Sequence, residues 1–217
     1  MSNEAEAVLR AGLAALGLGL PDAQVRQLLD YQSLIGKWNK VYNLTAVRDP
    51  AEMLTHHLLD SLAAVAPLQK HLQGRGLSAA SLLDVGAGAG LPGVVLAICC
   101  PTLSVTCVDT VGKKAAFIKH VALALGLPNL IGLHARVETI TQPFDVICSR
   151  AFASLADFTG WSQAALAPGG VWMALKGKHP AEELAMLPPG VAVFHVEPLV
   201  VPGLDAERCI IWLQKAS

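Results

Sequence analysis

Alternating glycines between two apolar segments form the part of the sequence best suited to hold a ligand. Residues 81–93 read SLLDVGAGAGLPG, and the apolar stretch 94–99 follows directly. Because glycine has no side chain, a ligand can lie against its backbone. A helix that begins after the turn would direct free N–H groups toward it, which favours a nucleotide or a carboxylate. The segment therefore predicts a buried strand, a ligand-binding turn and a helix start.

The identity of the ligand depends on the residues around this turn. Gly88 begins the pattern Gly-x-Gly-x-x-Gly, and Asp109 ends the next predicted strand, where an aspartate accepts hydrogen bonds from ribose hydroxyls. NAD and S-adenosylmethionine both fit these two features. Asp84, before the first glycine, and Pro92, inside the turn, are typical of methyltransferases and favour S-adenosylmethionine. A structural turn without a ligand is the alternative, and we favour binding because the turn and both aspartates occur together.

Strands and helices alternate from residue 81 onward, which predicts parallel strands with helices on both faces of one sheet. The expected strands are 81–86, 104–109, 130–135, 144–148 and 171–176, and the expected helices lie near 92–99, 113–126 and 154–166. After a short helix near 180–186, two strands at 191–199 and 207–214 are expected to pair antiparallel. A seventh strand inserted as such a hairpin is typical of a methyltransferase sheet and not of a dehydrogenase sheet.

The first third of the chain predicts helices. Residues 4–17 form an Ala- and Leu-rich helix, Asp22 is expected to cap a longer second helix, and Pro50 starts a third. We expect residues 1–78 to form a helical extension and residues 79–217 to form the ligand-binding domain, with both parts in one compact unit.

Composition restricts the classes of protein and of partner. The chain has 217 residues, of which 53% are apolar and 15% charged, so a globular protein with a sizeable core is expected. The net charge of -1 requires any RNA site to be a local basic patch. Candidates for it are Lys37, Lys40, Arg48, Arg136, Arg150, Lys176 and Lys178.

Cysteine usage and apolar patterning indicate the compartment. The five cysteines show no Cys-x-x-Cys spacing, the start of the chain lacks the basic residues of a signal peptide, and no apolar run is long enough to span a membrane. We therefore expect a reduced, cytoplasmic protein without disulfides, a bound metal or a membrane segment.

Arg150 follows the fourth predicted strand, where many amino-group methyltransferases carry an acidic or amide residue. An arginine cannot accept a proton from an attacking amine, but its planar fork can bind a carboxylate or a phosphate. At the carboxyl edge of a doubly wound sheet it would face the ligand crevice. We favour this functional role over that of a surface charge.

Five further segments form a more specific pattern. They are KWNK-x-YNLT at 37–45, H-x-x-DS at 57–61, LDVG through LPG at 83–93, SRAFA at 149–153 and ALKG at 174–177. Together they resemble the bacterial small-subunit ribosomal RNA guanine-N7 methyltransferases, also called the glucose-inhibited division protein B family. The resemblance extends from about residue 25 to 213. It implies an α/β, class I (Rossmann-like) methyltransferase with a seven-stranded, mostly parallel sheet. It also implies S-adenosyl-L-methionine as cofactor and 7-methylguanosine formation in the decoding-site loop of 16S ribosomal RNA or of the small ribosomal subunit.

The resemblance also implies roles for individual residues. Cofactor contacts are expected from Asp84, Gly86, Gly88, Gly90, Leu91, Asp109, Val137, Glu138 and Arg150, and contacts to the target nucleotide or RNA from Arg150, Asn43 and Arg136. The alternatives are a turn-capping role for Asp84, a helix-end cap for Asn43 and a solvated position for Arg136. His57 and Asp60, three residues apart on a helix, are expected to pair with each other as a structural feature.

The absence of an obvious catalytic dyad agrees with this chemistry. Guanine N7 has a lone pair and no proton, so an enzyme must mainly align it with the reactive methyl group. Two other functions remain open from the sequence: a small-molecule methyltransferase, suggested by the near-neutral charge, and a non-catalytic RNA-binding assembly factor with the same fold.

Overall fold

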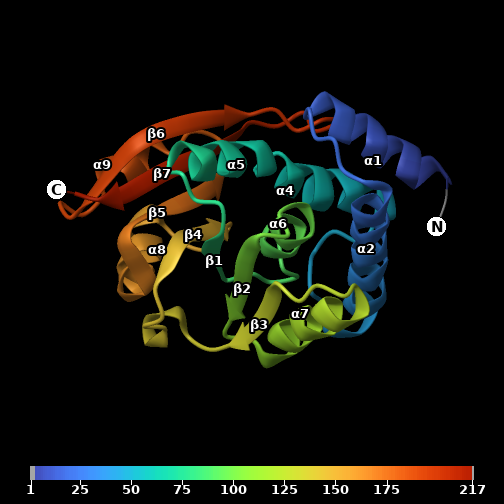
Figure 1. The fold of residues 1–217 in the computed structure, drawn as a ribbon, viewed down its shortest axis with the longest axis horizontal. Coiled ribbons are helices and arrows are strands. Elements are labelled where there is room, and N and C mark those ends of the chain that lie inside the picture. Colours follow the sequence, from blue (N-terminus) through green and yellow to red (C-terminus); the bar gives the residue numbers. More distant parts are fainter. Residues whose placement is uncertain (1–2, 217) are drawn as a thin grey trace.

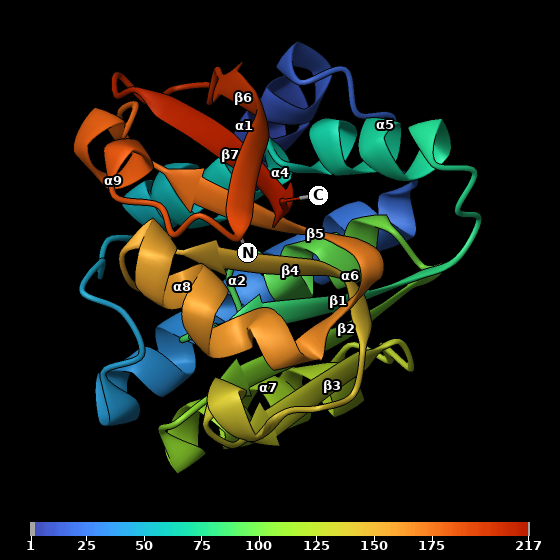
Figure 2. The same cartoon turned by 90° about the vertical axis from the view of Figure 1, so that its left-hand side faces the viewer.

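The computed structural model describes residues 3–216 and contains a seven-stranded sheet in the order β3-β2-β1-β4-β5-β7-β6. Figure 2 shows the strands in this order, from β6 at the top to β3 at the bottom. The first five strands run parallel, and β7 lies antiparallel between β5 and β6. The bounds are β1 (Ala80–Val85), β2 (Leu103–Asp109), β3 (Leu130–His134), β4 (Phe144–Arg150), β5 (Leu166–Lys176), β6 (Val191–Leu199) and β7 (Arg208–Lys215). The predicted parallel sheet and its terminal hairpin are confirmed.

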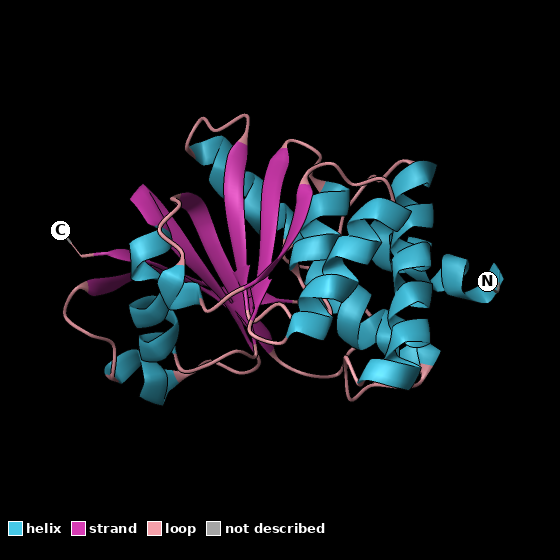
Figure 3. Cartoon of the chain, turned by 90° about the horizontal axis from the view of Figure 1, so that it is seen from below, coloured by secondary structure: helices cyan, strands magenta, loops and turns pink. Residues whose placement is uncertain are grey.

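Helices cover both faces of the sheet, as Figure 3 shows, with a thick layer on one side and a thin layer on the other. Adjacent residues of one strand serve the two faces: Leu82 packs in one apolar cluster and Leu83 in the other. The thick layer comprises α1 (Asn3–Ala15), α2 (Asp22–Tyr42), α3 (Pro50–Met53), the π-helical turn η1 (Leu54–Leu59), α4 (Asp60–Leu62), α5 (Val65–Gly74), α6 (Gly93–Cys99) and α7 (Gly112–Ala124). The thin layer comprises η2 (Val137–Thr139), α8 (Leu155–Ser162), η3 (Gln163–Ala165) and α9 (Ala181–Ala185).

Some boundaries differ from those expected. Pro21, not Asp22, is the cap residue of α2, and the Asp22 carboxylate instead binds Arg10 at 2.8 Å. The third helix starts at Pro50 as predicted, but the Asp49 carboxylate caps it by accepting the Ala51 N–H at 2.9 Å. A π-helical turn then interrupts it, and such turns often occur at functional sites.

The N-terminal helices pack directly against the rest of the molecule, as Figure 1 shows for α2 beside α6 and α7. The Trp38 ring lies 5.3 Å from that of Phe117 in α7. The buried Tyr31 hydroxyl donates a 2.6 Å hydrogen bond to the carbonyl of Ala89 in the glycine turn. The proposed division at residue 78 falls between α5 and β1 and stays a prediction.

The buried side chain of Asp84, the fifth residue of β1, holds the glycine turn in place. Its buried carboxylate accepts the Gly93 N–H at 2.8 Å, which ties the end of β1 to the start of α6. A side chain on Gly93 would collide with Asp84 and with Cys107, so the bond requires glycine at this position. Burial raises the pKa of Asp84 to about 7, although the Gly93 N–H and Arg150 oppose this shift.

Replacement of Gly93 by alanine should destabilise the protein because the new methyl group has no space. We expect Gly93→Ala to lower the free energy of unfolding by about 1–3 kcal/mol in urea titrations. Gly160 in α8 is a matched control, since a methyl group there meets open space. Gly160→Ala should be neutral or stabilise the helix by up to about 1 kcal/mol. Equal effects of the two changes would contradict the tight packing at Gly93.

The raised pKa of Asp84 predicts a pH-dependent stability. Between the ordinary value of 3.8 and about 7, the folded protein retains a proton that the unfolded chain releases. The free energy of unfolding should therefore fall as pH rises through this window, by at most about 1.4 kcal/mol per pH unit from this group. Asp84→Asn should remove that component, which urea titrations from pH 4.5 to 7.5 would detect. An identical slope in both proteins would show that Asp84 titrates normally.

Candidate functional site

Two cavities flank the glycine turn where β1, β2 and β4 end. The first, of about 370 Å³, is lined by the ends of β1 and β2 and by residues after β3 and β4. The second, of about 490 Å³, extends from the turn toward β5, β7 and the loop after α2. Gly86 and Ala151 line both cavities, so the two cavities are neighbours at these residues. Both volumes lie within the range of ligand sites in proteins.

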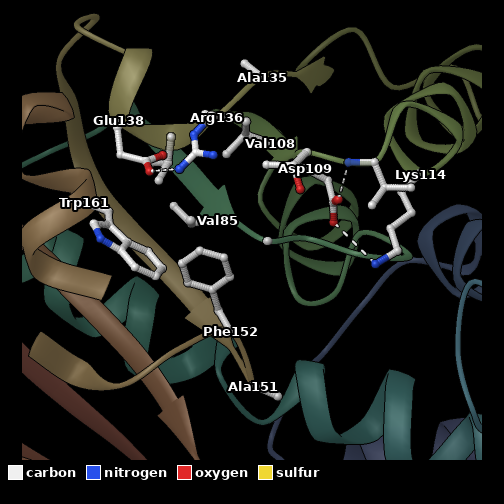
Figure 4. Close-up of a pocket in the computed structure, with 14 residues that line it drawn as sticks. Val85, Val108, Asp109, Lys114, Ala135, Arg136, Glu138, Ala151, Phe152 and Trp161 are labelled. Carbon is white, nitrogen blue, oxygen red and sulfur yellow. Dashed lines mark hydrogen bonds and ion pairs between the residues drawn. The ribbon is translucent and has the colours of Figure 1, made fainter. Parts of the chain in front are cut away.

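Asp109 is held rigidly at the edge of the first cavity (Figure 4). One carboxylate oxygen accepts the Val111 N–H at 2.8 Å, and the other accepts the Gly88 N–H at 3.0 Å. Lys114 lies 3.8 Å from the second oxygen. A carboxylate has about four acceptor positions, so Asp109 retains capacity for the hydroxyl groups of a ribose.

Two aromatic rings form the opposite wall of the first cavity (Figure 4). The ring centroids of Phe152 and Trp161 lie 5.9 Å apart in an edge-to-face arrangement, and Trp161 is 43% exposed. The Phe152 ring covers Gly86, whose φ of +66° and missing side chain permit this approach. Ala151 has a φ of 52°, a strained value for a residue with a side chain, and this bend brings Phe152 back over the turn. The wall suits a flat ring such as a purine.

The rim of the first cavity carries an ion pair. Arg136 donates to Glu138 at 2.7 Å, and this bond lowers the pKa of the Glu138 carboxyl. The Arg136 side chain is 73% exposed, which agrees with the alternative that this arginine is simply solvated. Val137 is buried in the wall of the cavity. Contacts from Val137 and Glu138 to an adenine, and from Arg136 to RNA, stay predictions.

Arg150 projects into the second cavity and binds an acid from another element. Its Nη1 donates to Asp60 Oδ2 at 2.6 Å and to the His56 carbonyl at 3.0 Å. The other Asp60 oxygen accepts a 2.7 Å bond from Arg208 Nε. The expected pairing of Asp60 with His57 is therefore wrong. His57 Nε2 instead lies 2.8 Å from the Thr45 hydroxyl, and burial lowers its pKa, which keeps the ring neutral at pH 7.

Of the remaining residues of the glycine turn, some line a cavity and others only shape the turn. Gly88 and Leu91 line the second cavity, and a side chain at Gly88 would meet nothing closer than 3.9 Å, so this stretch of backbone is open to a ligand. Gly90, with a φ of +89°, packs against Val94 and lines neither cavity. Asp84 lies beneath the turn and positions it, which is the capping role.

Two predicted polar residues have structural partners. Asn43 is the C-cap residue of α2, with a left-handed φ of 50°, and lines neither cavity; a contact from Asn43 to the target nucleotide stays a prediction. Lys176 donates to Glu183 at 2.8 Å and to the Ala153 carbonyl at 3.1 Å at the edge of the second cavity. Of the seven candidates for a basic patch, those in the cavity walls are Arg136, Arg150 and Lys176.

Sequence reasoning missed Lys114, Trp161 and Arg208. Lys114 and Trp161 occur on helices that follow strands, a position in which side chains often reach the crevice, but neither belongs to a recognisable motif. Arg208 is 148 residues from Asp60, so only the folded sheet brings the pair together.

The geometry fits the cofactor expected from the sequence. An anchored carboxylate, an aromatic wall and an open glycine backbone correspond to the ribose, purine and amino-acid parts of S-adenosylmethionine. Among the described residues, no group of three or more potential metal ligands occurs, and all five cysteines are free. Across the same part of the chain, every helix is too short or too polar to cross a membrane.

Solved structures support the fold. The chain matches a SAM dependent methyltransferase from Aquifex aeolicus with a TM-score of 0.53 and 19% identity, over 76% of this chain and 98% of the other. It matches TrmN from Thermus thermophilus with a TM-score of 0.54 and 23% identity, over 75% of this chain and 53% of the other. The sheet and its helical layers therefore form a class I methyltransferase fold.

Sequence comparisons identify the family. A Polaromonas species has a protein named "Ribosomal RNA small subunit methyltransferase G" that is 76% identical over 96% of this chain and 93% of its own length. The protein of the same name from Polaromonas naphthalenivorans is 71% identical over 96% of this chain and 95% of its own length. The GidB family model, described as rRNA small subunit methyltransferase G, matches residues 24–211. The chain therefore belongs to the GidB family, the rRNA small subunit methyltransferase G proteins.

Proposed function

We propose that this chain is a cytoplasmic S-adenosylmethionine-dependent methyltransferase that forms 7-methylguanosine in the 16S RNA of the small ribosomal subunit. The junction of the two cavities at Gly86 and Ala151 is the observation that carries the proposal. A ligand that extends across this junction would have one part in the first cavity and would present its far end to the second. The name that the relatives share supports small-subunit RNA as the substrate, and the sequence pattern of the family supports guanine N7.

The first cavity would hold the adenosine part of the cofactor. Asp109 would accept hydrogen bonds from the ribose hydroxyls, while Trp161 and Phe152 would pack against the adenine. The open backbone at Gly88 would lie along the methionine part. S-adenosylmethionine supplies, when bound, a methyl group on a positively charged sulfur.

The second cavity would admit the target base, and its residues favour a nucleophile that carries no proton. Arg150 has no acceptor atom, and neutral His57 is hydrogen-bonded to Thr45. Guanine N7 requires no base, so the residues around it have only to exclude water and align it with the methyl group. The second cavity provides the walls for this alignment.

Methylation of small subunits tests the function. Methyl-labelled cofactor and subunits from cells that lack this enzyme should yield labelled 7-methylguanosine, identified by mass spectrometry of digested RNA. Arg150→Gln should reduce transfer roughly 10- to 100-fold, since hydrogen bonds of a charged group contribute about 1.5–3 kcal/mol. Arg26→Gln, at an exposed position of α2, should retain the wild-type rate.

Each alternative function predicts a different outcome of this assay. Wild-type protein that binds the cofactor but labels no RNA would indicate a small-molecule substrate. Protein that binds neither S-adenosylmethionine nor S-adenosylhomocysteine in calorimetry would indicate an RNA-binding assembly factor.

Removal of the aromatic wall should weaken cofactor binding. We expect Trp161→Ala to raise the Kd of S-adenosylhomocysteine about tenfold, because stacking of a base on an aromatic ring contributes about 1–3 kcal/mol. Trp161→Phe retains an aromatic face and should bind within about threefold of wild type. Unchanged affinity in Trp161→Ala, measured by calorimetry, would place the adenine elsewhere.

A further inference from the structure

Asp60 joins two arginines from distant parts of the sheet. One carboxylate oxygen binds Arg150 at the end of β4, and the other binds Arg208 at the start of β7, at 2.6 and 2.7 Å. Asp60 itself is 5% exposed and follows the π-helical turn of the third helix. Because each guanidinium has its own oxygen, the carboxylate fixes the separation of the two cations.

This cluster carries an excess positive charge. Two guanidinium groups face one carboxylate, and Asp60 is the only acid among the described residues that line the second cavity. Lys176 in the same wall is neutralised by Glu183, and His57 is neutral because burial lowers its pKa. A cavity wall with unbalanced positive charge favours an anion, although the chain as a whole has a net charge of -1.

Arg208 has hydrogen-bonding capacity left for such an anion. Its Nε binds Asp60, and its Nη1 donates to the Glu207 carbonyl at 2.8 Å. Within the described residues these bonds do not use Nη2, and the side chain is 25% exposed at the cavity wall. A guanidinium whose Nη2 donors are unused at a cavity wall can still donate to an oxygen of a phosphate.

The position of Arg208 in the sheet indicates which anion it meets. In the strand order β2-β1-β4-β5-β7, Asp109 lies at one side of the site and Arg208 at the other. The first cavity, with the ribose and purine positions, is on the Asp109 side. An anion beside Arg208 is therefore separated from the nucleoside part of the cofactor, which leaves two sources for it: the substrate, or the carboxylate in the amino-acid part of the cofactor.

We propose that Arg208 binds a backbone phosphate of the RNA next to the target nucleotide, and that Asp60 is a positioning residue that aligns Arg208 with Arg150. This inference rests on the proposed function. It adds a residue that would hold the RNA strand in a fixed position relative to the cofactor. Arg150 and Arg208 then act together in the wall of the second cavity.

Arg208→Gln tests the phosphate contact. With small subunits from cells that lack this enzyme, the KM should rise about tenfold, while the Kd of S-adenosylhomocysteine stays within about twofold. The slope of log affinity for the RNA against log salt concentration should become shallower by about 0.7–0.9, as expected for one lost phosphate contact. Arg208→Lys should keep the wild-type slope, and Arg26→Gln, the matched control, should alter neither KM nor cofactor affinity.

Asp60→Asn tests whether Asp60 aligns the two arginines or whether the site attracts RNA by its charge alone. This change adds one positive unit to the site, so a site that only attracts RNA would bind it more tightly and show a lower KM. Loss of alignment predicts the opposite, a higher KM for the subunits. Thermal unfolding of each variant would establish that it is folded, and Arg208→Lys provides the comparison that keeps the charge.

Three results would overturn the inference. An unchanged KM and salt slope in Arg208→Gln would exclude a phosphate contact. A loss of S-adenosylhomocysteine affinity with unchanged KM would assign the anion to the carboxylate of the cofactor. A lower KM in Asp60→Asn would exclude the positioning role. Failure of the wild-type protein to label RNA is a different result, because it would refute the proposed function itself.

Discussion

The hydrogen bond between the buried carboxylate of Asp84 and the Gly93 amide is the constraint on which the site depends. It joins the end of β1 to the start of α6, and the chain between them must turn within a few residues. Left-handed backbone at Gly86, Gly88 and Gly90 makes that turn possible. The same absence of a side chain leaves the backbone open at Gly88, in the wall of the second cavity. One requirement of folding thereby creates the surface that a ligand needs.

The two sides of this turn have different chemistry because different strands supply them. Toward β2, a carboxylate held by two backbone amides faces aromatic rings, an arrangement that suits a nucleoside. Toward β5 and β7, the Asp60 bridge holds two guanidinium groups in a positively charged wall, which suits a polyanion. The order of strands thus places a cavity suited to a nucleoside beside a cavity wall suited to a polyanion. Transfer of a group between the two ligands requires this adjacency.

Local sequence predicted those parts of the molecule that local chemistry determines. Glycine spacing, strand alternation and the position of Asp109 at a strand end depend on neighbouring residues, and the sheet and the first cavity follow from them. The partners of Asp60 depend on packing between segments 90 and 148 residues apart, which periodicity does not encode. Asp22 failed as a cap for the related reason that a tertiary partner, Arg10, binds its carboxylate. The sequence left the role of Asn43 open, because asparagine suits both the end of a helix and a contact to a nucleotide.

A crystal structure of the protein with S-adenosylhomocysteine tests the central claim most directly. The account predicts ribose hydroxyls within hydrogen-bonding distance of Asp109, the adenine between Trp161 and the β3 side of the cavity, and the amino-acid part along Gly86 and Gly88. Ligand bound at another surface, with Phe152 and Trp161 filling the first cavity, would contradict it.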